Sequence, residues 1–366
     1  MNQRLKNAAH WLNDQNINLA FVNSTANVYY FSSFYCQPHE RLLGLFLFPD
    51  KDPILVCPAM ESSQARDAGW KYGIIDYNDS ENPWEKVKSQ LHEHNGNKAD
   101  AIAIEREQLN YARSMELQSI YPEAEITDFE ACANQLRVVK DEKELQILRE
   151  AAELADFGVE VGISALAEGK SEVEIIAEIE YELKKKGVSG MSFSTMVLFG
   201  DKSALPHGKP GDRTLKSGDM VLFDLGVVYK GYCSDITRTV AYKSMNDNQK
   251  EIYNIVKDAQ QKALDMSKPG TRIGDLDKVA RDYITEKGYG EYFLHRIGHG
   301  LGIEVHEYPS MSDTNNEAMQ EGMVYTLEPG VYVPGIGGVR IEDDVVVTKD
   351  GYETLTKFSK ELLIIE

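Results

Sequence analysis

The sequence predicts a mixed α/β (α+β) protein of two domains, and three observations support this fold class. Residues 1–130 alternate between strand-like and helix-like patterns, as a compact α/β domain does. Two later stretches, 220–242 and 325–347, each have the pattern of two strands joined by a tight turn. The chain has 366 residues, which is more than one core usually serves. Since 42% of them are hydrophobic, each of two domains could bury a core. We therefore expect one domain at 1–130 and a second at 136–366.

The first domain is expected to contain four helices and four strands. The strand candidates are short apolar runs, whereas the helix candidates carry their apolar residues at helical spacing. We predict helices at 4–13, 62–68, 83–92 and 111–119, and strands at 19–22, 42–48, 54–57 and 101–104. No Gly-rich phosphate loop follows any of these strands, so the domain shows no sign of a nucleotide site.

The second domain is expected to begin with two capped helices. Asp141 and Glu144 have the capping-box spacing before a run of apolar residues at intervals of three and four, which predicts a long helix. Ser171 and Glu174 repeat the box, and the helix that they open should stop at Gly187 after a run of lysines. Two more helices are expected between the strand pairs, at 246–266 and 275–287.

Composition limits the partners and the cellular location. A formal net charge of −20 repels nucleic acid and anionic lipid, so we expect neither as a partner. The first residues lack the continuous apolar segment of a secretory signal, and no apolar run is long enough to span a membrane. We therefore expect a cytoplasmic protein. The four cysteines are scattered without CxxC spacing, which favours reduced, buried thiols at Cys36, Cys57, Cys132 and Cys233.

The strand pair at 220–242 predicts an acidic site. Its turn signal is Lys230-Gly231, and folding about that turn places Asp224 beside Thr237 and diagonal to Asp235. Two carboxylates then project from one face of an otherwise apolar hairpin. Such a pair should either share a proton or hold a cation. Thr237 points to the same face and is expected to orient a carboxylate.

The strand pair at 325–347 adds two more carboxylates. Folding it about Gly335 sets Glu328 opposite Glu342. His299 lies between the two strand pairs, among glycines that let the backbone approach another group closely. His295 and His299 have the i, i+4 spacing of a helical zinc pair, but the same glycines and the missing HExxH pattern weaken that interpretation.

Together these residues offer four carboxylates and one imidazole. One catalytic ion rarely uses so many anionic ligands, whereas two divalent ions would neutralise them. The set is rich in oxygen and contains no thiolate, so we predict Mn²⁺, with Co²⁺ or Zn²⁺ as alternatives. Met191 and Met196 are expected to serve packing. The predicted ligands are Asp224, Asp235, His299, Glu328 and Glu342.

These residues, in the contexts DLGVVYKGYCSDITRT, GHGLG, LEPGVY and VRIEDD, resemble the metallopeptidases of the pita-bread fold. The resemblance covers essentially the whole chain, because the first domain is similar to the creatinase-type N-terminal domain of prolidases and aminopeptidase P. The segment LRVVKDEKELQILREAAELAD is similar to the start of their catalytic domain.

The resemblance also implies individual roles. Asp224 would bind one metal ion, His299 and Glu328 would bind the other, and Asp235 and Glu342 would bridge both. His207 in LPHG and His306 in EVHE match the two further active-site histidines of the family.

The implied reaction is peptide hydrolysis by a hydroxide that bridges two ions. Glu328 would take the proton of the nucleophile, while His207 and His306 would stabilise the oxyanion and assist the leaving nitrogen. The substrate implied is a small peptide with proline after the scissile bond, because that tertiary amide needs a dedicated pocket.

Whether the enzyme is a dipeptidase or an aminopeptidase is the harder choice. A prolidase must recognise the carboxylate that follows proline, and Arg41, Arg296 and Arg340 are candidates for this contact. The loop 37–41, with Arg296 and Ser310, resembles the bacterial cytoplasmic Xaa-Pro dipeptidases, in which such a loop reaches the neighbouring subunit's site. This favours an Xaa-Pro dipeptidase that acts as a homodimer.

Other members of the fold give the alternatives. An aminopeptidase P would act on longer peptides with the same metals. A non-enzymatic peptide-binding protein of the same fold would typically have lost ligands, and this chain keeps them. Methionine aminopeptidase would not need residues 1–130, and creatinase does without the metals.

Overall fold

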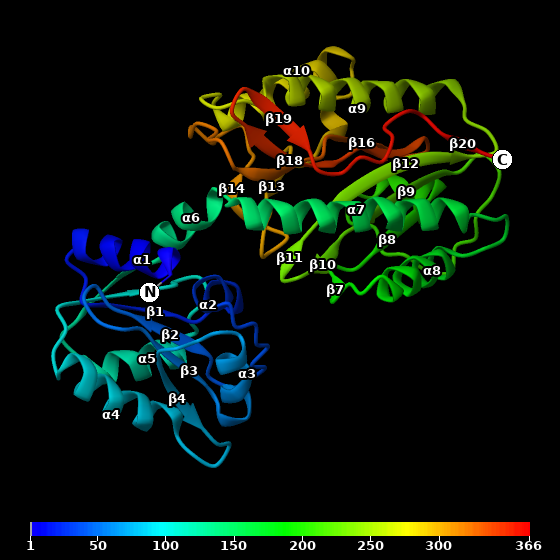
Figure 1. Ribbon diagram of the computed structural model, residues 1–366. Coiled ribbons are helices and arrows are strands. Elements are labelled where there is room, and N and C mark those ends of the chain that lie inside the picture. Colours follow the sequence, from blue (N-terminus) through cyan, green and yellow to red (C-terminus); the bar gives the residue numbers. More distant parts are fainter. Residues whose placement is uncertain (1) are drawn as a thin grey trace. The chain divides into compact units, whose positions relative to one another are not determined.

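The computed structural model describes residues 2–366, which form two compact units (Figure 1). The first unit ends at Arg137 and the second comprises Val138–Glu366. Both units mix helices with sheets, so the predicted fold class is confirmed. The four cysteines are buried and free, as expected.

The first unit is built on a six-stranded sheet with the strand order β4-β3-β2-β1-β5-β6. Its strands are β1 (Leu19–Val22), β2 (Gly44–Leu47), β3 (Ile54–Pro58), β4 (Gly73–Tyr77), β5 (Ala101–Ile104) and β6 (Glu125–Asp128). Its helices are α1 (Gln3–Asp14), α2 (Thr25–Ser32), α3 (Ser62–Asp67), α4 (Pro83–Asn95), α5 (Tyr111–Ile120) and α6 (Glu130–Val138).

All eight elements predicted for this unit are present, but α2, β4, β6 and α6 were not predicted. Helix α2 is short and rich in aromatic residues, so its sequence alone looks strand-like. It is helical because the side chain of Ser24 caps it and the buried carboxylate of Glu105 accepts hydrogen bonds from Ser24 N (2.8 Å) and Asn27 Nδ2 (2.6 Å). The acceptor lies 81 residues away in the chain, which no local pattern reveals.

The second unit contains four long helices and fourteen short strands. The helices are α7 (Glu142–Ser164), α8 (Glu172–Lys185), α9 (Asp247–Met266) and α10 (Ile273–Glu286). The strands are β7 (Gly190–Met191), β8 (Met196–Phe199), β9 (Met220–Leu225), β10 (Val227–Tyr229), β11 (Tyr232–Cys233), β12 (Ile236–Tyr242), β13 (His299–Gly300), β14 (Glu307–Ser310), β15 (Val324–Leu327), β16 (Gly330–Val333), β17 (Gly337–Arg340), β18 (Asp343–Thr348), β19 (Gly351–Thr354) and β20 (Ile364–Ile365).

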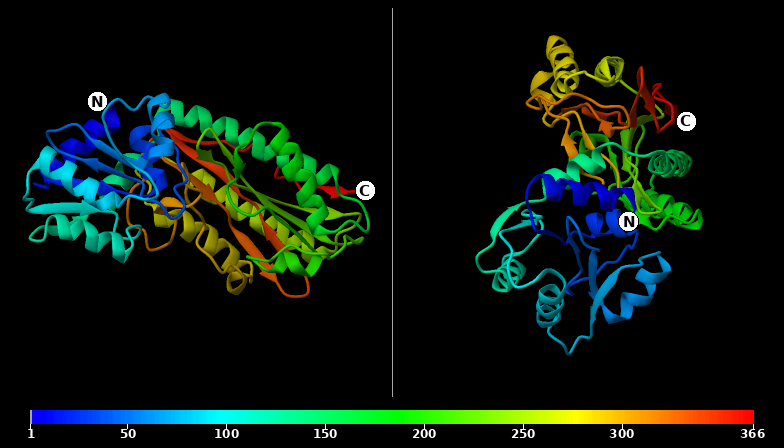
Figure 2. Two further views of the ribbon diagram at one scale, coloured as in Figure 1. Left: turned by 90° about the horizontal axis from the view of Figure 1, so that it is seen from below. Right: turned by 60° about the vertical axis from the view of Figure 1, so that its left-hand side comes forward.

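The strands of this unit lie between two pairs of helices (Figures 1 and 2). Helices α7 and α8 pack with β8, β9 and β12 around one apolar core, and α9 and α10 pack with β15 and β18 around another. Both predicted capping boxes, at Asp141 and Ser171, are present with their reciprocal hydrogen bonds. The strands in the middle therefore have a covered outer face and an inner face where a site can form.

The registers of both predicted hairpins are confirmed. In the first, Thr237 pairs with Asp224, and Lys230 and Gly231 both have positive φ, as a type I′ turn requires. In the second, β15 pairs with β18 and β16 pairs with β17 in a single continuing register, which sets Glu328 opposite Glu342.

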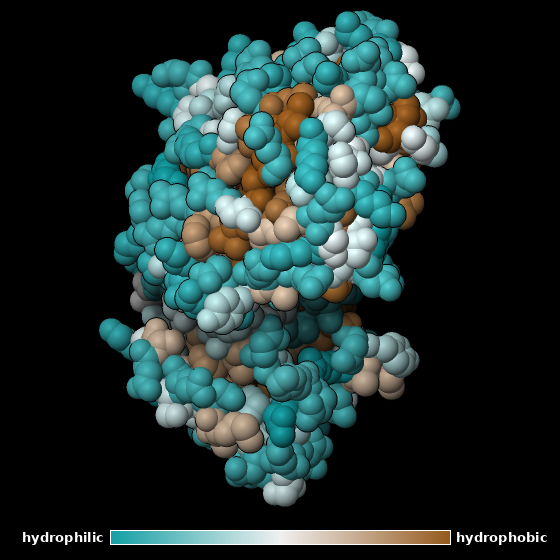
Figure 3. Space-filling view, turned by 90° about the vertical axis from the view of Figure 1, so that its right-hand side faces the viewer, coloured by the Kyte–Doolittle hydropathy of each residue, from teal (hydrophilic) through white to brown (hydrophobic). Residues whose placement is uncertain are grey.

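Polar side chains cover most of the face shown in Figure 3, and the hydrophobic residues between them form small groups. Among residues 2–366, no helix has both the length and the apolar character needed to cross a membrane.

Candidate metal centre

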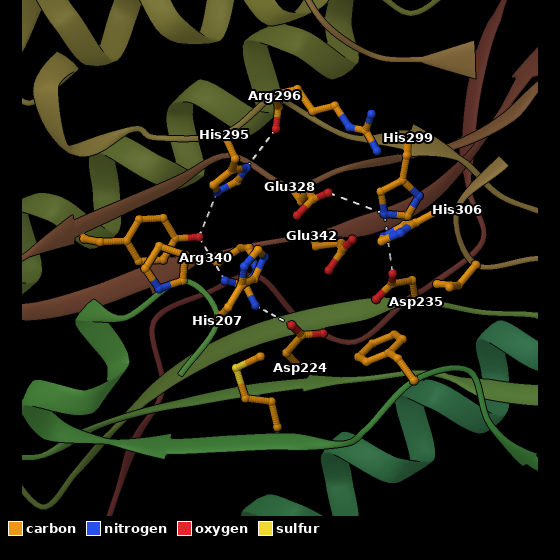
Figure 4. Close-up of a pocket in the computed structure, with 15 residues that line it drawn as sticks. His207, Asp224, Asp235, His295, Arg296, His299, His306, Glu328, Arg340 and Glu342 are labelled. Carbon is orange, nitrogen blue, oxygen red and sulfur yellow. Dashed lines mark hydrogen bonds and ion pairs between the residues drawn. The ribbon is translucent and has the colours of Figure 1, made fainter. Parts of the chain in front are cut away.

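A pocket of about 380 Å³ opens within the second unit (Figure 4). It brings together every predicted site residue of this unit, contributed by the hairpins and by three loops. The lining residues are Phe193, Met196, Pro206, His207, Asp224, Asp235, His295, Arg296, His299, Val305, His306, Glu328, Tyr332, Arg340 and Glu342.

Three of the predicted ligands form a tight cluster at the floor of the pocket. One ligand atom each from Asp235, His299 and Glu342 lies within 4.8 Å of the others, and all three residues are buried. His299 Nε2 is 3.7 Å from Asp235 Oδ2 and 3.5 Å from Glu328 Oε1. Asp235 Oδ1 is buried without a hydrogen-bond partner. An unsatisfied carboxylate oxygen among other ligand atoms is the arrangement expected where a cation binds.

The electrostatics of the cluster also favour a cation. Burial, followed by the repulsion of neighbouring carboxylates, raises the pKa of Asp235 and Glu328 well above their ordinary values, and burial with the nearby Asp224 raises the pKa of Glu342 to about 7. Burial lowers the pKa of His299 to about 3, so this imidazole is neutral, which is its ligating form. The acids therefore need a positive partner to be ionised together.

The orientation of His299 is set by its backbone surroundings. Its Nδ1 lies 3.1 Å from the carbonyl of Gly300, which can only accept, so Nδ1 carries the proton and Nε2 is free to bind an ion. The predicted close approach of the backbone at the glycines is present, because a Cβ at Gly298 would lie 2.0 Å from the carbonyl oxygen of Thr326.

Two polar side chains connect the hairpins at the cluster. The Oγ1 of Thr237 donates to Glu342 Oε2 at 2.6 Å, so this hydroxyl orients Glu342 across the hairpins. Asp344, which the sequence analysis did not single out, accepts a hydrogen bond from the backbone N–H of Asp235 at 3.1 Å. Neither contact follows from the pattern of one strand, because each joins the first hairpin to the second.

Arg340 lies beside the carboxylates, and its guanidinium already forms several hydrogen bonds. It donates to Thr237 Oγ1 (3.0 Å) and Tyr332 Oη (2.9 Å) and pairs with Asp224, and its side chain is 4% exposed. Tyr332 Oη also lies 2.8 Å from His295 Nε2. Sequence reasoning missed Tyr332 and discounted His295, although LEPGVY and HRIGH contain both.

The remaining histidines and arginines differ in setting. His306 is exposed, and its ring packs edge-on against that of His299 with the ring centroids 4.2 Å apart. His207 is exposed at the edge of the pocket. Arg296 is exposed and donates to Ser310 Oγ at 3.1 Å. Arg41 belongs to the first unit, where it forms a bidentate pair with Asp79 at 2.7 and 2.8 Å.

The pocket also has an apolar wall that the sequence analysis did not predict. Phe193, Pro206 and Val305 form it together with Met196, which we had assigned to packing. Met196 pairs with Asp224 in the register of β8 and β9, so the two side chains share a face of the sheet. The sequence analysis did not identify β8, a strand of four residues, and therefore could not place Met196 at the pocket.

Comparison with known proteins places the site in a family context. Residues 146–349 match the model of metallopeptidase family M24, and residues 4–139 match the creatinase/prolidase N-terminal domain. The chain is 56% identical to a Bacillus subtilis (strain 168) protein named "Putative dipeptidase YkvY" over 99% of both chains.

Two solved structures have similar folds. The prolidase from Pyrococcus horikoshii OT3 is 37% identical with a TM-score of 0.91, over 99% of this chain and 100% of the other. The X-Pro aminopeptidase from Thermotoga maritima MSB8 is 32% identical with a TM-score of 0.86, over 96% of this chain and 98% of the other.

Proposed function

This chain belongs to metallopeptidase family M24, and we propose from this premise that it is an Xaa-Pro dipeptidase. The observation that carries the proposal is the buried cluster of Asp235, His299 and Glu342 with one unpartnered carboxylate oxygen, in a pocket that also contains three further histidines and an apolar wall. Its similarity to the P. horikoshii prolidase supports the dipeptidase assignment.

The residues fit a pair of divalent ions. Asp224 would hold one ion, His299 and Glu328 the other, and Asp235 and Glu342 both. The donors are four carboxylates and a neutral imidazole without a thiolate, which suits Mn²⁺, with Co²⁺ or Zn²⁺ as alternatives. When bound, the ions would lower the pKa of a shared water enough for hydroxide to attack near neutral pH and would polarise the scissile carbonyl.

The pocket residues would move the protons. Glu328 lines the pocket with its Oε1 3.5 Å from His299 Nε2, so its carboxylate would be placed to take a proton from the attacking water. His306 lies against His299, and its pKa is lowered by burial, so it is neutral and can donate a hydrogen bond to the developing oxyanion. His207, at the pocket edge, would assist departure of the proline nitrogen.

Recognition of the dipeptide needs a cation for its free carboxylate. Among the three predicted arginines, Arg296 is exposed at the pocket and is our first candidate. Arg340 lines the pocket, but its contacts with Asp224, Thr237 and Tyr332 suit it better to holding the acids in place. Arg41 would contribute only if its loop entered a neighbouring subunit's site, as a homodimer would allow. A dimer and a cytoplasmic location stay predictions.

A second candidate function is aminopeptidase P activity on longer peptides. The similarity to the T. maritima X-Pro aminopeptidase favours it, since the same ligands would serve both reactions. The two functions differ in what lies beyond proline, because only the dipeptidase must exclude a further residue.

Hydrolysis of Leu-Pro and Leu-Pro-Gly by Mn²⁺-loaded protein tests the proposal, with a chelated sample as control. We expect cleavage of the dipeptide alone and its loss on chelation. Preference for the tripeptide would replace the proposal with aminopeptidase P. Cleavage of neither peptide would favour a binding protein of this fold.

A further inference from the structure

A buried ion pair lies just outside the pocket, next to His306. Lys140 Nζ is 2.8 Å from Glu307 Oε1, and the two side chains are only 1% and 6% exposed. The partners are 167 residues apart in the chain. Neither lines the pocket, so neither can touch a substrate held there.

Glu307 forms the base of the loop that carries His306. This loop, residues 301–306, connects β13 to β14, and Glu307 pairs with Gly300 across its ends. The carboxylate of Glu307 faces inward, since a Cβ at Gly302 would lie 2.4 Å from Glu307 Oε1. It also accepts the backbone N–H of Glu304 at 3.4 Å. The loop is therefore folded around this carboxylate.

Lys140 is itself fixed. Its backbone N–H donates to the carbonyl of Gly322 at 2.9 Å, and it directly precedes the capping box that opens α7. Its ammonium group thus reaches the loop from a rigid attachment point. The hairpin tip provides a second anchor, because Cys233 N donates to the carbonyl of Gly302 at 2.7 Å.

We infer that the Lys140–Glu307 ion pair is a positioning device for His306. A buried ion pair contributes little more stability than two apolar side chains of the same size, because desolvation offsets its attraction. The ion pair instead determines where the loop lies. It therefore also determines the position of His306, the residue directly before Glu307. The inference rests on the role proposed above for His306.

The test uses a double substitution, Lys140→Met with Glu307→Leu, because a single substitution would leave one buried charge unpaired and could unfold the protein. In Mn²⁺-loaded protein we expect kcat for Leu-Pro to fall by about 10- to 100-fold, with KM and bound metal within about twofold of the original. The conservative variant Lys140→Arg keeps the charge and should retain most of kcat.

The control is Arg149→Met with Glu353→Leu, which removes a partly exposed pair that joins α7 to the distant strand β19 and borders no pocket residue. We expect it to leave kcat unchanged. An unchanged kcat in the Lys140/Glu307 double variant, with the original protein active, would overturn the inference while the proposed function stands. An inactive original protein would instead overturn the proposed function.

A second measurement separates positioning from general damage. In a His306→Ala background, the double substitution should lower kcat by less than about twofold further, because residues acting through one group are not additive. A full 10- to 100-fold further loss would show that the ion pair acts independently of His306 and would overturn the inference.

Discussion

The carboxylates proposed as ligands and the pocket histidines are held in place by different means. Asp224 and Asp235 lie on one hairpin, and Glu328 and Glu342 are opposed on the other, so strand register alone brings each pair together. The histidines His207, His295 and His306 lie in loops.

Each of these loops is attached to a buried acid outside the pocket that is itself paired with a cation. Glu172 accepts Phe199 N (3.0 Å) and Gly211 N (2.8 Å) at the two ends of the His207 loop and pairs with Lys202. Asp277 accepts Ile297 N at 2.8 Å and pairs with Arg281, which donates to the carbonyl of His295. Glu307 and Lys140 do the same for the loop of His306.

This contrast explains which substitutions each region tolerates. A hairpin register depends on many backbone hydrogen bonds and an alternating pattern, so one distant substitution rarely shifts it. A loop that depends on a few contacts can lose its geometry when its ion pair is removed. We therefore expect ligand substitutions to abolish the site and substitutions at the acids outside the pocket to weaken it.

The largest effect is expected at the shared ligands of the hairpins. Asp235→Ala and Glu342→Ala should each lose bound metal and lower activity by at least about a thousandfold, since several kcal/mol of charge stabilisation depend on the ions. Metal analysis and Leu-Pro hydrolysis on the same sample check this. Asp350→Ala, in an exposed turn, is the control. Full activity in either ligand variant would remove the bridging assignment.

Next in size are the histidines that do not bind metal in our proposal. His306→Ala and His207→Ala should lower kcat by about 10²- to 10⁴-fold while the bound metal stays constant, because each loses a proton donor. Exposed His10→Ala serves as the control. Loss of metal from His306→Ala would instead make this residue a ligand. The ligands would then not be confined to the strands, as our comparison assumes.

The same contrast decides what the sequence could predict. Period-two patterns and turn signals fix local register, so the sequence predicted the pairing of Asp224 with Thr237 and the opposition of Glu328 to Glu342 that the strand registers show. Tyr332, Met196 and Asp344 depend on how one hairpin or strand meets another, and local patterns carry no such information. Helix α2 was missed for the same reason, since its stabilising acceptor, Glu105, is remote in the chain.

Removing the metal should reverse the pH dependence of stability. The pKa of Glu342 is 4.5 ordinarily and about 7 in the folded, metal-free protein, because burial and Asp224 disfavour its charge. The folded state therefore retains a proton that the unfolded chain releases. As pH rises from about 4.5 to above 7, Glu342 should therefore lower the free energy of unfolding of the metal-free protein. Burial lowers the pKa of His295 to about 4 and that of His299 to about 3, and this opposes the fall below about pH 6.5, so the net fall is expected above that pH.

Asp235 and Glu328 shift in the same direction and strengthen this slope. In the Mn²⁺-loaded protein the carboxylates bind as anions, so stability should instead fall as pH decreases. Thermal denaturation between about pH 6.5 and about pH 8, with chelator or with Mn²⁺, checks both slopes. Asp343 does not interfere, because Arg238 and Lys360 outweigh its burial and hold its pKa below the ordinary value, outside this range. Parallel slopes in the two samples would contradict the proposed ligand set.

The smallest effect is expected at Glu172, on the loop side of the comparison. Glu172→Gln keeps the size of the side chain but removes the charge that pairs with Lys202, and it leaves one oxygen for the two N–H groups of Phe199 and Gly211. We expect kcat to fall about tenfold with the bound metal unchanged, because His207 loses its fixed position.

Glu178→Gln on the same helix removes an exposed pair with Lys170 and should leave kcat unaltered. In a His207→Ala background the Glu172 substitution should have no further effect on kcat. If Glu172→Gln instead lowers the amount of bound metal, Glu172 also holds the hairpins in place. The strands would then depend on distant ion pairs as much as the loops do.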